Sequence, residues 1–412
     1  MDQGPFYDDL ETRDPAEREA AQFAALSGHI REARDKAPYY TKLLCDIDPA
    51  EITDRAALAT LPVTRKSELV NIQSAGNPLG GMTTLPAGQL KRIFQSPGPT
   101  YDAEGFGPDW WGMARALFAS GFRKGDIVHN TFAYHFTPAG VMLESGAHAL
   151  GCAVFPAGVG NTELQVQAIH DIRPAGYTGT PSYLRQLLEK AVEMGQDVSS
   201  LKKACVAGEG LPPDLRKAIE DHGIHCGQVY ASADIGNIAY ESPARDGLIV
   251  DERHIVEVVR PGTGDPVADG EVGEVVVTVL RSDYALIRFA TGDLSLMLGG
   301  QSPCGRTNAR LKGWMGRADQ TTKVKGMFVH PAQVAEIVRR HPVIARARVV
   351  VTHDGHTDVM TVKCEMNESG EALISALNTT IQNVCKLKGF AECVPPGSLP
   401  NDGKVIEDAR QS

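Results

Sequence analysis

The 412-residue sequence has no long uninterrupted apolar run. A membrane-spanning helix needs about 18–20 consecutive apolar residues, so we expect no membrane association through such a helix. The first residues are polar and acidic, whereas a secretory signal has a basic segment followed by an apolar one. We therefore expect a cytoplasmic protein.

An excess of positive charge is also missing. The formal net charge is −10, whereas nucleic-acid-binding domains carry basic faces. We expect no nucleic-acid partner, although a local basic patch for phosphates is compatible with this total. Hydrophobic residues make up 42% and charged residues 22% of the chain, as in ordinary soluble globular proteins, and the length allows two or three structural units.

The eight cysteines show no paired spacing. They stand at positions 45, 152, 205, 226, 304, 364, 385 and 393. Such scatter is typical of reduced thiols in a cytosolic chain and does not indicate a disulfide framework.

Helical and apolar extended stretches alternate from Asp109 onward, after a predicted amphipathic helix over Asp14–Lys36. Strands are expected near 126–131, 152–155, 175–179 and 201–207, and helices near 110–118, 141–150, 163–172 and 182–194. This alternation predicts βαβ units and a mainly parallel sheet, with ligands at the carboxyl ends of its strands.

The last part of the chain changes pattern twice. Residues 255–259 and 273–277 are β-rich around a Pro/Gly turn and predict antiparallel hairpins, within a β-subdomain of about 240–315. Beyond it, two helical and two extended stretches predict a compact α+β unit over 319–412. The expected fold class is therefore α/β, with a large domain over 1–318 followed by a small mobile domain.

Two short motifs lie at the junction of these units. Asp293 closes the segment Arg288–Asp293 after an apolar strand, where a carboxylate can accept two hydroxyl hydrogen bonds from a ribose diol. Arg317 and Asp319 follow in a charged run that resembles a hinge. The motifs predict a nucleotide site beside a domain boundary at Asp319.

At these residues the chain resembles the adenylate-forming ligases, most closely the phenylacetate–CoA ligase family. Members activate a carboxylic acid as acyl-AMP and pass the acyl group to coenzyme A. The resemblance runs from Gly4 to Lys404 and implies ATP, Mg²⁺ and coenzyme A, together with a small carboxylic acid as partner.

The family's phosphate loop is altered in this chain. Small residues in such a loop expose backbone N–H groups and hydroxyls to phosphate, and here they are Ser96, Gly98 and Thr100. Prolines at 97 and 99 remove two N–H donors, and Tyr101 replaces a glycine. Asp102 stands at the usual lysine position, where an anion is expected to repel phosphate. The alternative interpretation is an ordinary surface turn.

The resemblance implies roles for four further groups of residues. Gly208, Glu209 and Gly210 form the adenine loop, and the segment with Tyr230, Ala231, Ser232 and Asp234 is the family's aromatic and acidic signature, its acid holding Mg²⁺ between phosphates. Tyr134, His135, Phe136 and Ala231 line the acyl pocket, which favours an aryl or arylacetic acid. Lys325 and Gly326 face coenzyme A after the hinge turns. Core packing is the alternative for the aromatic loop, and a structural cap for Asp234.

Lys404 is the residue that most favours activity. It stands near the C-terminus beside Gly403, and the resemblance makes it the cation that bridges the carboxylate and the α-phosphate during adenylation. In the expected reaction Lys404, Thr100 and Mg²⁺ at Asp234 offset charge, while Asp293 and Arg317 hold the ribose.

Some relatives carry a structural zinc in the β-subdomain. Ser242 and Ser302 replace two of their cysteines, which leaves Cys304 isolated, so we expect no structural zinc. Two alternatives to the ligase remain: a non-catalytic protein that binds nucleotide or acyl-CoA, and an adenylating enzyme with another acyl acceptor. The oligomeric state is open, with a homodimer as the working expectation.

Overall fold

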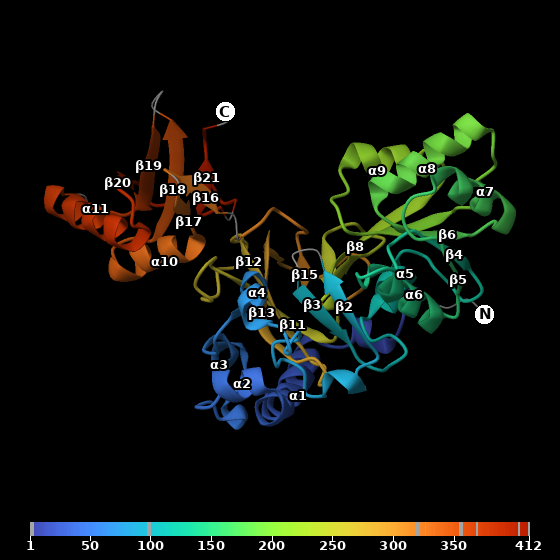
Figure 1. Cartoon of the computed structure of the whole chain (residues 1–412), viewed down its shortest axis with the longest axis horizontal. Coiled ribbons are helices and arrows are strands. Elements are labelled where there is room, and N and C mark those ends of the chain that lie inside the picture. Colours follow the sequence, from blue (N-terminus) through green and yellow to red (C-terminus); the bar gives the residue numbers. More distant parts are fainter. Residues whose placement is uncertain are drawn as a thin grey trace.

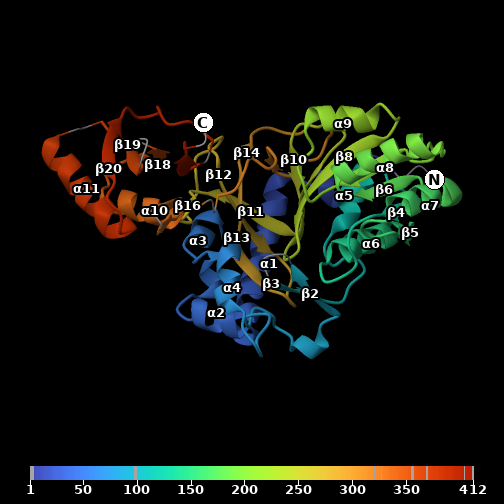
Figure 2. The ribbon, with the colours of Figure 1, turned by 45° about the horizontal axis from the view of Figure 1, so that its top comes forward.

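The computed structural model describes residues 4–96, 100–318, 321–325, 327–353, 357–367, 370–402 and 404–410. Three bodies are visible in Figure 1: a C-terminal unit in red and orange, a green lobe at the opposite end, and a blue and yellow body between them. The turned view in Figure 2 keeps this order. The predicted α/β class is confirmed.

A nine-stranded sheet forms the green lobe and reaches into the middle body. Its order is β14-β15-β10-β9-β8-β7-β6-β4-β5, and the five strands from β8 to β5 are parallel. The bounds are β4 Ile127–Asn130, β5 Ala153–Pro156, β6 Gly176–Gly179, β7 Lys203–Val206, β8 His225–Ser232, β9 Gly236–Glu241, β10 Leu248–Val250, β14 Met297–Leu298 and β15 Arg310–Leu311. Antiparallel pairing begins where β9 turns back along β8.

The helices of this lobe begin and end where local chemistry predicts. They are α5 Met113–Ala119, α6 Ala139–Leu150, α7 Thr162–Ile172, α8 Pro181–Met194 and α9 Pro213–Glu220. In α8, Thr180 caps the first turn and Pro181 follows it, while Gly195 ends the helix in the left-handed conformation. Leu184, Leu187 and other apolar residues of α8 pack on the sheet.

The middle body is built on a four-stranded sheet of order β1-β13-β12-β11. Its strands are β1 Thr64–Arg65, β11 His254–Val259, β12 Gly273–Val279 and β13 Leu286–Ser295. The hairpins of β11, β12 and β13 are antiparallel, as the sequence predicts. The edge strand β1 was not predicted, because two residues give no strand signal. It runs parallel to β13, with Thr64 beside Phe289.

The N-terminal helices surround this sheet. They are α1 Pro15–Lys36, α2 Pro38–Leu43, α3 Arg55–Ala59 and α4 Leu69–Ile72, with 3₁₀ turns at Asp9–Thr12, Pro49–Glu51, Lys66–Glu68 and Ala87–Gln89. Asp14 caps α1 by accepting hydrogen bonds from the N–H groups of Ala16 and Glu17. Leu26 and Ile30 of α1 are fully buried in the core cluster.

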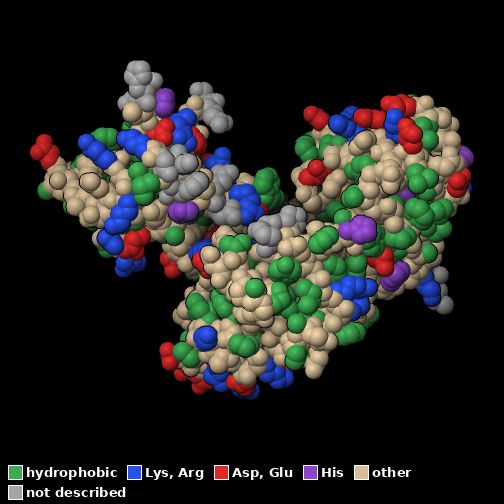
Figure 3. All heavy atoms as spheres, in the orientation of Figure 1, with side chains coloured by type: hydrophobic (Ala, Val, Ile, Leu, Met, Phe, Trp, Pro, Cys, Tyr) green, Lys and Arg blue, Asp and Glu red, His purple; other side chains and the backbone are tan. Residues whose placement is uncertain are grey.

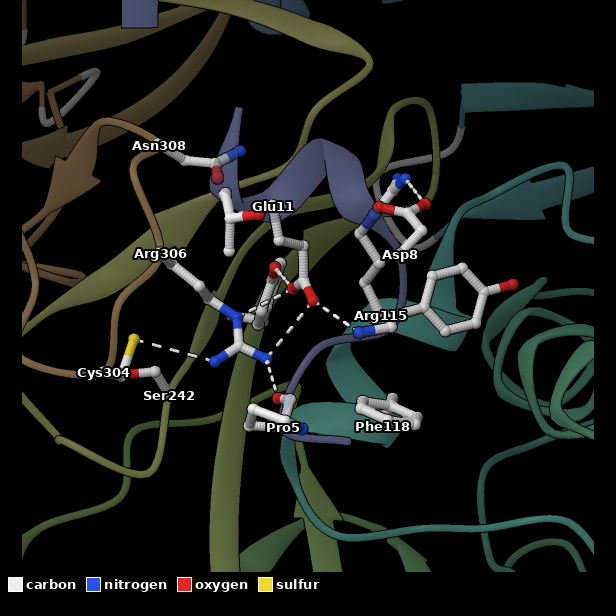
Figure 4. A network of polar contacts seen from close by, with 12 residues as sticks. Pro5, Asp8, Glu11, Arg115, Phe118, Ser242, Cys304, Arg306 and Asn308 are labelled. Atoms are coloured by element: carbon white, nitrogen blue, oxygen red, sulfur yellow. Dashed lines mark hydrogen bonds and ion pairs between the residues drawn. The ribbon is translucent and has the colours of Figure 1, made fainter. Parts of the chain in front are cut away.

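A buried ion pair joins the first residues of the chain to the β-subdomain. Arg306 Nε lies 2.7 Å from Glu11 Oε1, and both side chains are almost fully buried (Figure 4). Tyr240 donates its hydroxyl hydrogen to the same carboxylate, and Arg306 also reaches the Pro5 carbonyl at 3.1 Å. The N-terminal segment is therefore fixed by charge as well as by packing.

The altered phosphate loop belongs to a separate hairpin. Strands β2 Arg92–Ser96 and β3 Thr100–Glu104 pair antiparallel, with Ser96 beside Thr100. Pro97, Gly98 and Pro99 lie outside the described residues.

The C-terminal unit has its own core, drawn from residues between Val324 and Ile406. Its elements are β16 Thr322–Val324, β17 Met327–Val329, α10 Pro331–Arg340, β18 Arg346–His353, β19 Asp358–Glu365, α11 Glu371–Cys385, β20 Phe390–Val394 and β21 Ile406–Asp408. The four-stranded sheet has the order β20-β19-β18-β21, with α10 and α11 packed together beside it. The predicted hinge residue Asp319 lies outside the described residues.

On the face drawn in Figure 3, basic and acidic side chains are interspersed, and the surface is hollowed between the C-terminal unit and the opposite lobe. Within the described ranges, no helix combines the length and the apolar character that crossing a membrane requires.

Candidate active site

Asp293 is the centre of a polar cluster built from three separate segments. Tyr230 of β8 donates its hydroxyl hydrogen to Asp293 Oδ2 at 2.8 Å, and Arg317 Nη1 lies 3.1 Å from Oδ1. Asp293 and Arg317 also form an isolated β-bridge, which fixes their backbones side by side. The structure thus brings Tyr230, which the sequence analysis selected in another motif, to the predicted pair Asp293 and Arg317.

Trp314 completes this cluster and was missed from the sequence. Its indole N–H donates to Asp293 Oδ1 at 3.0 Å, although 58% of the residue is exposed. An exposed tryptophan close to a charged motif is itself a signal for a binding surface, because such a large ring is normally buried.

Asp234 lies in a second, buried cluster. Its side chain is fully buried, and Oδ2 forms an ion pair with the ammonium of Lys66. Ser232 donates its hydroxyl hydrogen to the same oxygen at 3.4 Å, and the Arg281 guanidinium donates to the Asp234 carbonyl at 2.8 Å. Burial opposes ionisation of Asp234, but the Lys66 ammonium holds the pKa of this carboxyl below its ordinary value.

Asp102 faces this cluster from β3 and is also fully buried. Ser96 donates its hydroxyl hydrogen to Asp102 Oδ2. Burial, and then the neighbouring Asp234 carboxylate, raise the pKa of Asp102 well above its ordinary value. The expectation that Asp102 acts as an anion that repels phosphate is therefore wrong: the side chain is enclosed, and its environment favours the neutral acid.

Other residues of the phosphate and adenine loops are placed as follows. Thr100 is buried in β3 next to Ser96. Gly208 has a positive φ of 83°, and Glu209 Oε1 accepts a hydrogen bond from the Ser182 N–H at the start of α8. Gly210 lies in the same loop, and Ala231 is half-buried in β8 next to Tyr230. Glu209 thus orders the turn that supports this loop.

The predicted acyl-pocket residues follow β4 at its carboxyl end. Tyr134 is half-buried, and its hydroxyl oxygen accepts a hydrogen bond from Asn130 Nδ2 at 2.8 Å. His135 is exposed, and Phe136 is 76% exposed with a positive φ of 62°. The Phe136 carbonyl accepts a hydrogen bond from the Gln95 N–H of β2. The aromatic loop therefore lies against the phosphate-loop hairpin.

Lys404 lines a cavity of about 440 Å³ between two parts of the chain. On one side is the connection between β11 and β12, including Arg260 and Thr263, and on the other is the C-terminal unit, including Arg339 and Arg346. The Lys404 N–H donates to Asp402 Oδ1 at 3.1 Å, and neither Asp234 nor Asp293 lines the cavity. The structure therefore does not bring this lysine to the two carboxylate clusters.

Among the remaining predicted residues, the structure describes only Lys325. Lys325 is exposed in the β16–β17 hairpin, where its N–H donates to Asp358 Oδ2 at 2.9 Å. Gly98, Asp319 and Gly326 are outside the described residues.

Cys304 lies in the region where zinc was considered. Ser302 donates its hydroxyl hydrogen to the sulfur at 3.1 Å. Arg306 Nη1 lies 3.6 Å from the sulfur (Figure 4). In the portion of the chain that is described, no three His, Cys, Asp or Glu side chains are grouped to hold a metal ion.

Lys66 is the second residue that the sequence analysis missed. Nothing local in the sequence connects it with Asp234, which is 168 residues away. Only the tertiary fold reveals it: β1 pairs with β13, and Lys66, the next residue, pairs with Asp234.

Comparison with known proteins identifies the family of this chain. The family model described as "AMP-binding enzyme" matches residues 110–279. Phenylacetate–coenzyme A ligase from Aromatoleum evansii is 32% identical over 384 residues, which cover 88% of this chain and 86% of the relative. The ligases of the same name from Thermus thermophilus and Escherichia coli are 30% and 31% identical over 88% and 89% of this chain, and 84% and 86% of their own lengths.

Solved structures share the fold. A 2-hydroxyisobutyryl-CoA ligase in the postadenylation state, bound to its acyl-AMP, has a TM-score of 0.72 at 24% identity, covering all of this chain and 94% of that one. The same ligase in the thioesterification state, with CoA, has a TM-score of 0.70 at 25% identity, covering 98% and 92%. With relatives at this identity over most of its length, the chain belongs to the phenylacetate–CoA ligase family of AMP-forming acid–CoA ligases.

Proposed function

We propose that this chain uses ATP to activate an aryl or arylacetic acid as acyl-AMP and then transfers the acyl group to coenzyme A. The observation that carries the proposal is the cluster of Tyr230, Asp293 and Arg317. Family membership supports it, because the curated relatives are phenylacetate–coenzyme A ligases.

The cluster has the chemistry of a ribose site. The Asp293 carboxylate accepts hydrogen bonds from the side chains of Tyr230, Trp314 and Arg317. Vicinal ribose hydroxyls are donors of the same kind, and a carboxylate accepts two of them at once. The ring of Tyr230 and the half-exposed indole of Trp314 supply flat faces for a purine.

The first half-reaction joins the acid to the nucleotide. A carboxylate oxygen of the acid attacks the α-phosphorus of ATP, and the bond from that phosphorus to the pyrophosphate oxygen breaks. In this proposal Thr100 and Lys404 offset the negative charge that develops. Because Lys404 lines the cavity against the β11–β12 connection, its part requires the C-terminal unit to turn, with Asp319 as the hinge.

The second half-reaction uses the mixed anhydride. The thiolate sulfur of coenzyme A attacks the acyl carbon, the bond from that carbon to the phosphate oxygen breaks, and AMP leaves. The thiol proton passes to solvent. Lys325 faces coenzyme A at this stage, and the protein supplies no nucleophile of its own.

The choice of acid rests on the loop after β4. Tyr134 and Phe136 place aromatic rings next to the β2–β3 hairpin. An acid with an aromatic or similarly apolar body would remove these rings from water, which favours its binding.

Magnesium does not fit Asp234 as the family resemblance would place it. Mg²⁺ requires oxygen ligands in near-octahedral geometry and keeps several waters. Here the carboxylate is fully buried, and one oxygen is paired with the Lys66 ammonium. No step of the proposed reaction therefore passes through a protein-held magnesium ion.

The function is tested by acid-dependent pyrophosphate release from ATP, measured across a panel of aryl and alkyl acids with and without coenzyme A. We expect release that requires an aryl acid, with acyl-CoA as product, and its loss in Lys404→Ala. Release that needs an acid but proceeds to a product other than acyl-CoA would assign another acceptor. Folded protein that binds ATP but releases no pyrophosphate with any acid would instead identify a non-catalytic binding protein.

A further inference from the structure

Lys66 reaches the nucleotide side of the molecule through the parallel pairing of β1 with β13. Thr64 lies beside Phe289 and Arg65 beside Ala290, so the next residue follows the strand toward Thr291 and Asp293. Lys66 begins the 3₁₀ turn Lys66–Glu68 directly after β1. Its position is therefore fixed by a sheet edge, not by a free loop.

The ammonium of Lys66 lies near three acidic side chains, of which Asp102 favours the neutral form. It pairs with the Asp234 carboxylate, and the charge of Asp293 also acts on it. Burial alone would lower the pKa of Lys66, but these carboxylates, with Asp234 foremost, raise it above its ordinary value. The Lys66 side chain is 27% exposed, whereas its partner Asp234 is fully buried, so Lys66 lies at the edge of the buried cluster.

The coordination of Asp234 leaves little access for a metal ion. Oδ2 receives Lys66 and the Ser232 hydroxyl, while Arg281 holds the carbonyl of the same residue. Asp102 covers the carboxylate from β3, and Ser96 in turn binds Asp102. A divalent cation at Asp234 would have to lie beside an ammonium, which repels it.

We propose that Lys66 occupies on Asp234 the position that a divalent cation would take, and that its ammonium contributes the positive charge for the nucleotide phosphates at this site. The inference rests on the proposed function, since it assigns the phosphates of ATP to this side of the cluster. The inference also accounts for Asp102, which stands where the family's phosphate loop has a lysine. The cation comes instead from Lys66 after β1, and Asp102 helps to enclose Asp234, which pairs with Lys66. An ammonium is well suited to this task, because it is a compact charge with three donors.

The chain contains a closely matched control lysine. Lys91 is 30% exposed and pairs at 2.9 Å with Glu104, a fully buried carboxylate on β3. Lys66 is 27% exposed and pairs with a carboxylate that is equally buried. Arg92 keeps Glu104 paired when Lys91 is replaced. Lys91→Met therefore removes a lysine of similar burial without touching the Asp234 cluster.

The test is calorimetric binding of the α,β-methylene analogue of ATP, which cannot be adenylated, in EDTA and in excess Mg²⁺. For the parent and for Lys91→Met we expect dissociation constants that differ by less than about threefold between the two conditions. For Lys66→Met we expect affinity in EDTA to fall by about 10- to 100-fold, the equivalent of one charged hydrogen bond. Added Mg²⁺ should restore much of the lost affinity, because the Asp234 carboxylate no longer has an ammonium partner and can bind the ion. Lys66→Arg should bind within about tenfold of the parent.

Four outcomes overturn the inference. If Lys66→Met binds the nucleotide like the parent in EDTA, the Lys66 ammonium does not contribute to phosphate binding. If the affinity of the parent itself collapses in EDTA, the phosphates depend on a divalent cation and not on Lys66. If Lys66→Met does not fold, Lys66→Met combined with Asp234→Asn removes both charges, and unchanged binding by that variant counts equally against the proposal. A parent that binds no nucleotide under either condition overturns the proposed function as well, which separates the two failures.

Discussion

Tyr230 of β8 donates its hydroxyl hydrogen to Asp293 of β13 at 2.8 Å, which joins the large sheet to the sheet of the β-subdomain. Burial, and then the Asp293 charge, raise the pKa of Tyr230 well above its ordinary value, so the phenol keeps the hydrogen that it donates. The two strands belong to different sheets, and the nucleotide site that we propose lies where they meet.

Asp293→Ala should weaken nucleotide binding by about 10- to 100-fold, because each hydrogen bond to a charged acceptor contributes about 1.5–3 kcal/mol. The sharper measurement compares ATP with 2′,3′-dideoxy-ATP. The parent should prefer ATP, whereas Asp293→Ala should bind both nucleotides alike. A variant that keeps the full preference for ATP would place the ribose elsewhere. Asp197→Ala, at an exposed carboxylate that pairs with Arg173, serves as the control.

Trp314 should report nucleotide binding by its fluorescence. It is 58% exposed beside Asp293, whereas Trp110 and Trp111 are buried. Addition of ATP should therefore change the emission of the parent, and Trp314→Phe should lose most of that change while calorimetry still detects binding. An unchanged signal in Trp314→Phe would mean that the nucleotide acts on the buried tryptophans instead.

The sequence predicted what local patterns can encode. The alternation of helical and extended stretches predicted β4 to β7 and the helices between them, because 2.0- and 3.6-residue periods are visible within a single segment. Asp293 was recognised for the same reason, since a charged residue at the end of an apolar strand stands out without knowledge of the fold.

The residues that were missed depend on contacts between distant segments. Lys66 meets Asp234 only because the two-residue strand β1 pairs with β13, and so short a strand has no periodic signal. The interpretation of Asp102 failed in another way. A carboxylate in a supposed surface turn should be ionised, but the fold buries this one between Ser96 and Asp234. The charge of a residue is set by burial and neighbours, which a sequence does not give.

Arg306→Met should destabilise the protein by about 3–5 kcal/mol, because it leaves Glu11 buried without its cation. The double variant with Glu11→Gln should be less destabilised than the sum of the two single changes, since neither charge is then left alone. Urea unfolding curves measure both effects. Arg173→Met removes an exposed pair with Asp197 and should cost less than about 1 kcal/mol. Equal losses for Arg306→Met and Arg173→Met would contradict the role of the buried pair.

His29 should make the protein lose stability in acid. The side chain is buried in α1, and burial lowers its pKa from 6.5 to about 4. The unfolded chain therefore binds a proton at a pH where the folded chain does not. The resulting stability is fully present above pH 6.5 and is lost as the pH falls from 6.5 toward 4, by up to about 3 kcal/mol.

His29→Gln removes the titrating group and should flatten this part of the profile. Urea unfolding at a series of pH values between 4 and 7 measures the slope for the parent and the variant. His222→Gln, at an exposed histidine, should leave the slope of the parent unchanged. Because the unfolded state takes up the proton, the parent must lose stability as acid is added. A His29→Gln profile as steep as that of the parent would assign the acid sensitivity to other groups, such as the buried His254, whose pKa burial also lowers to about 4.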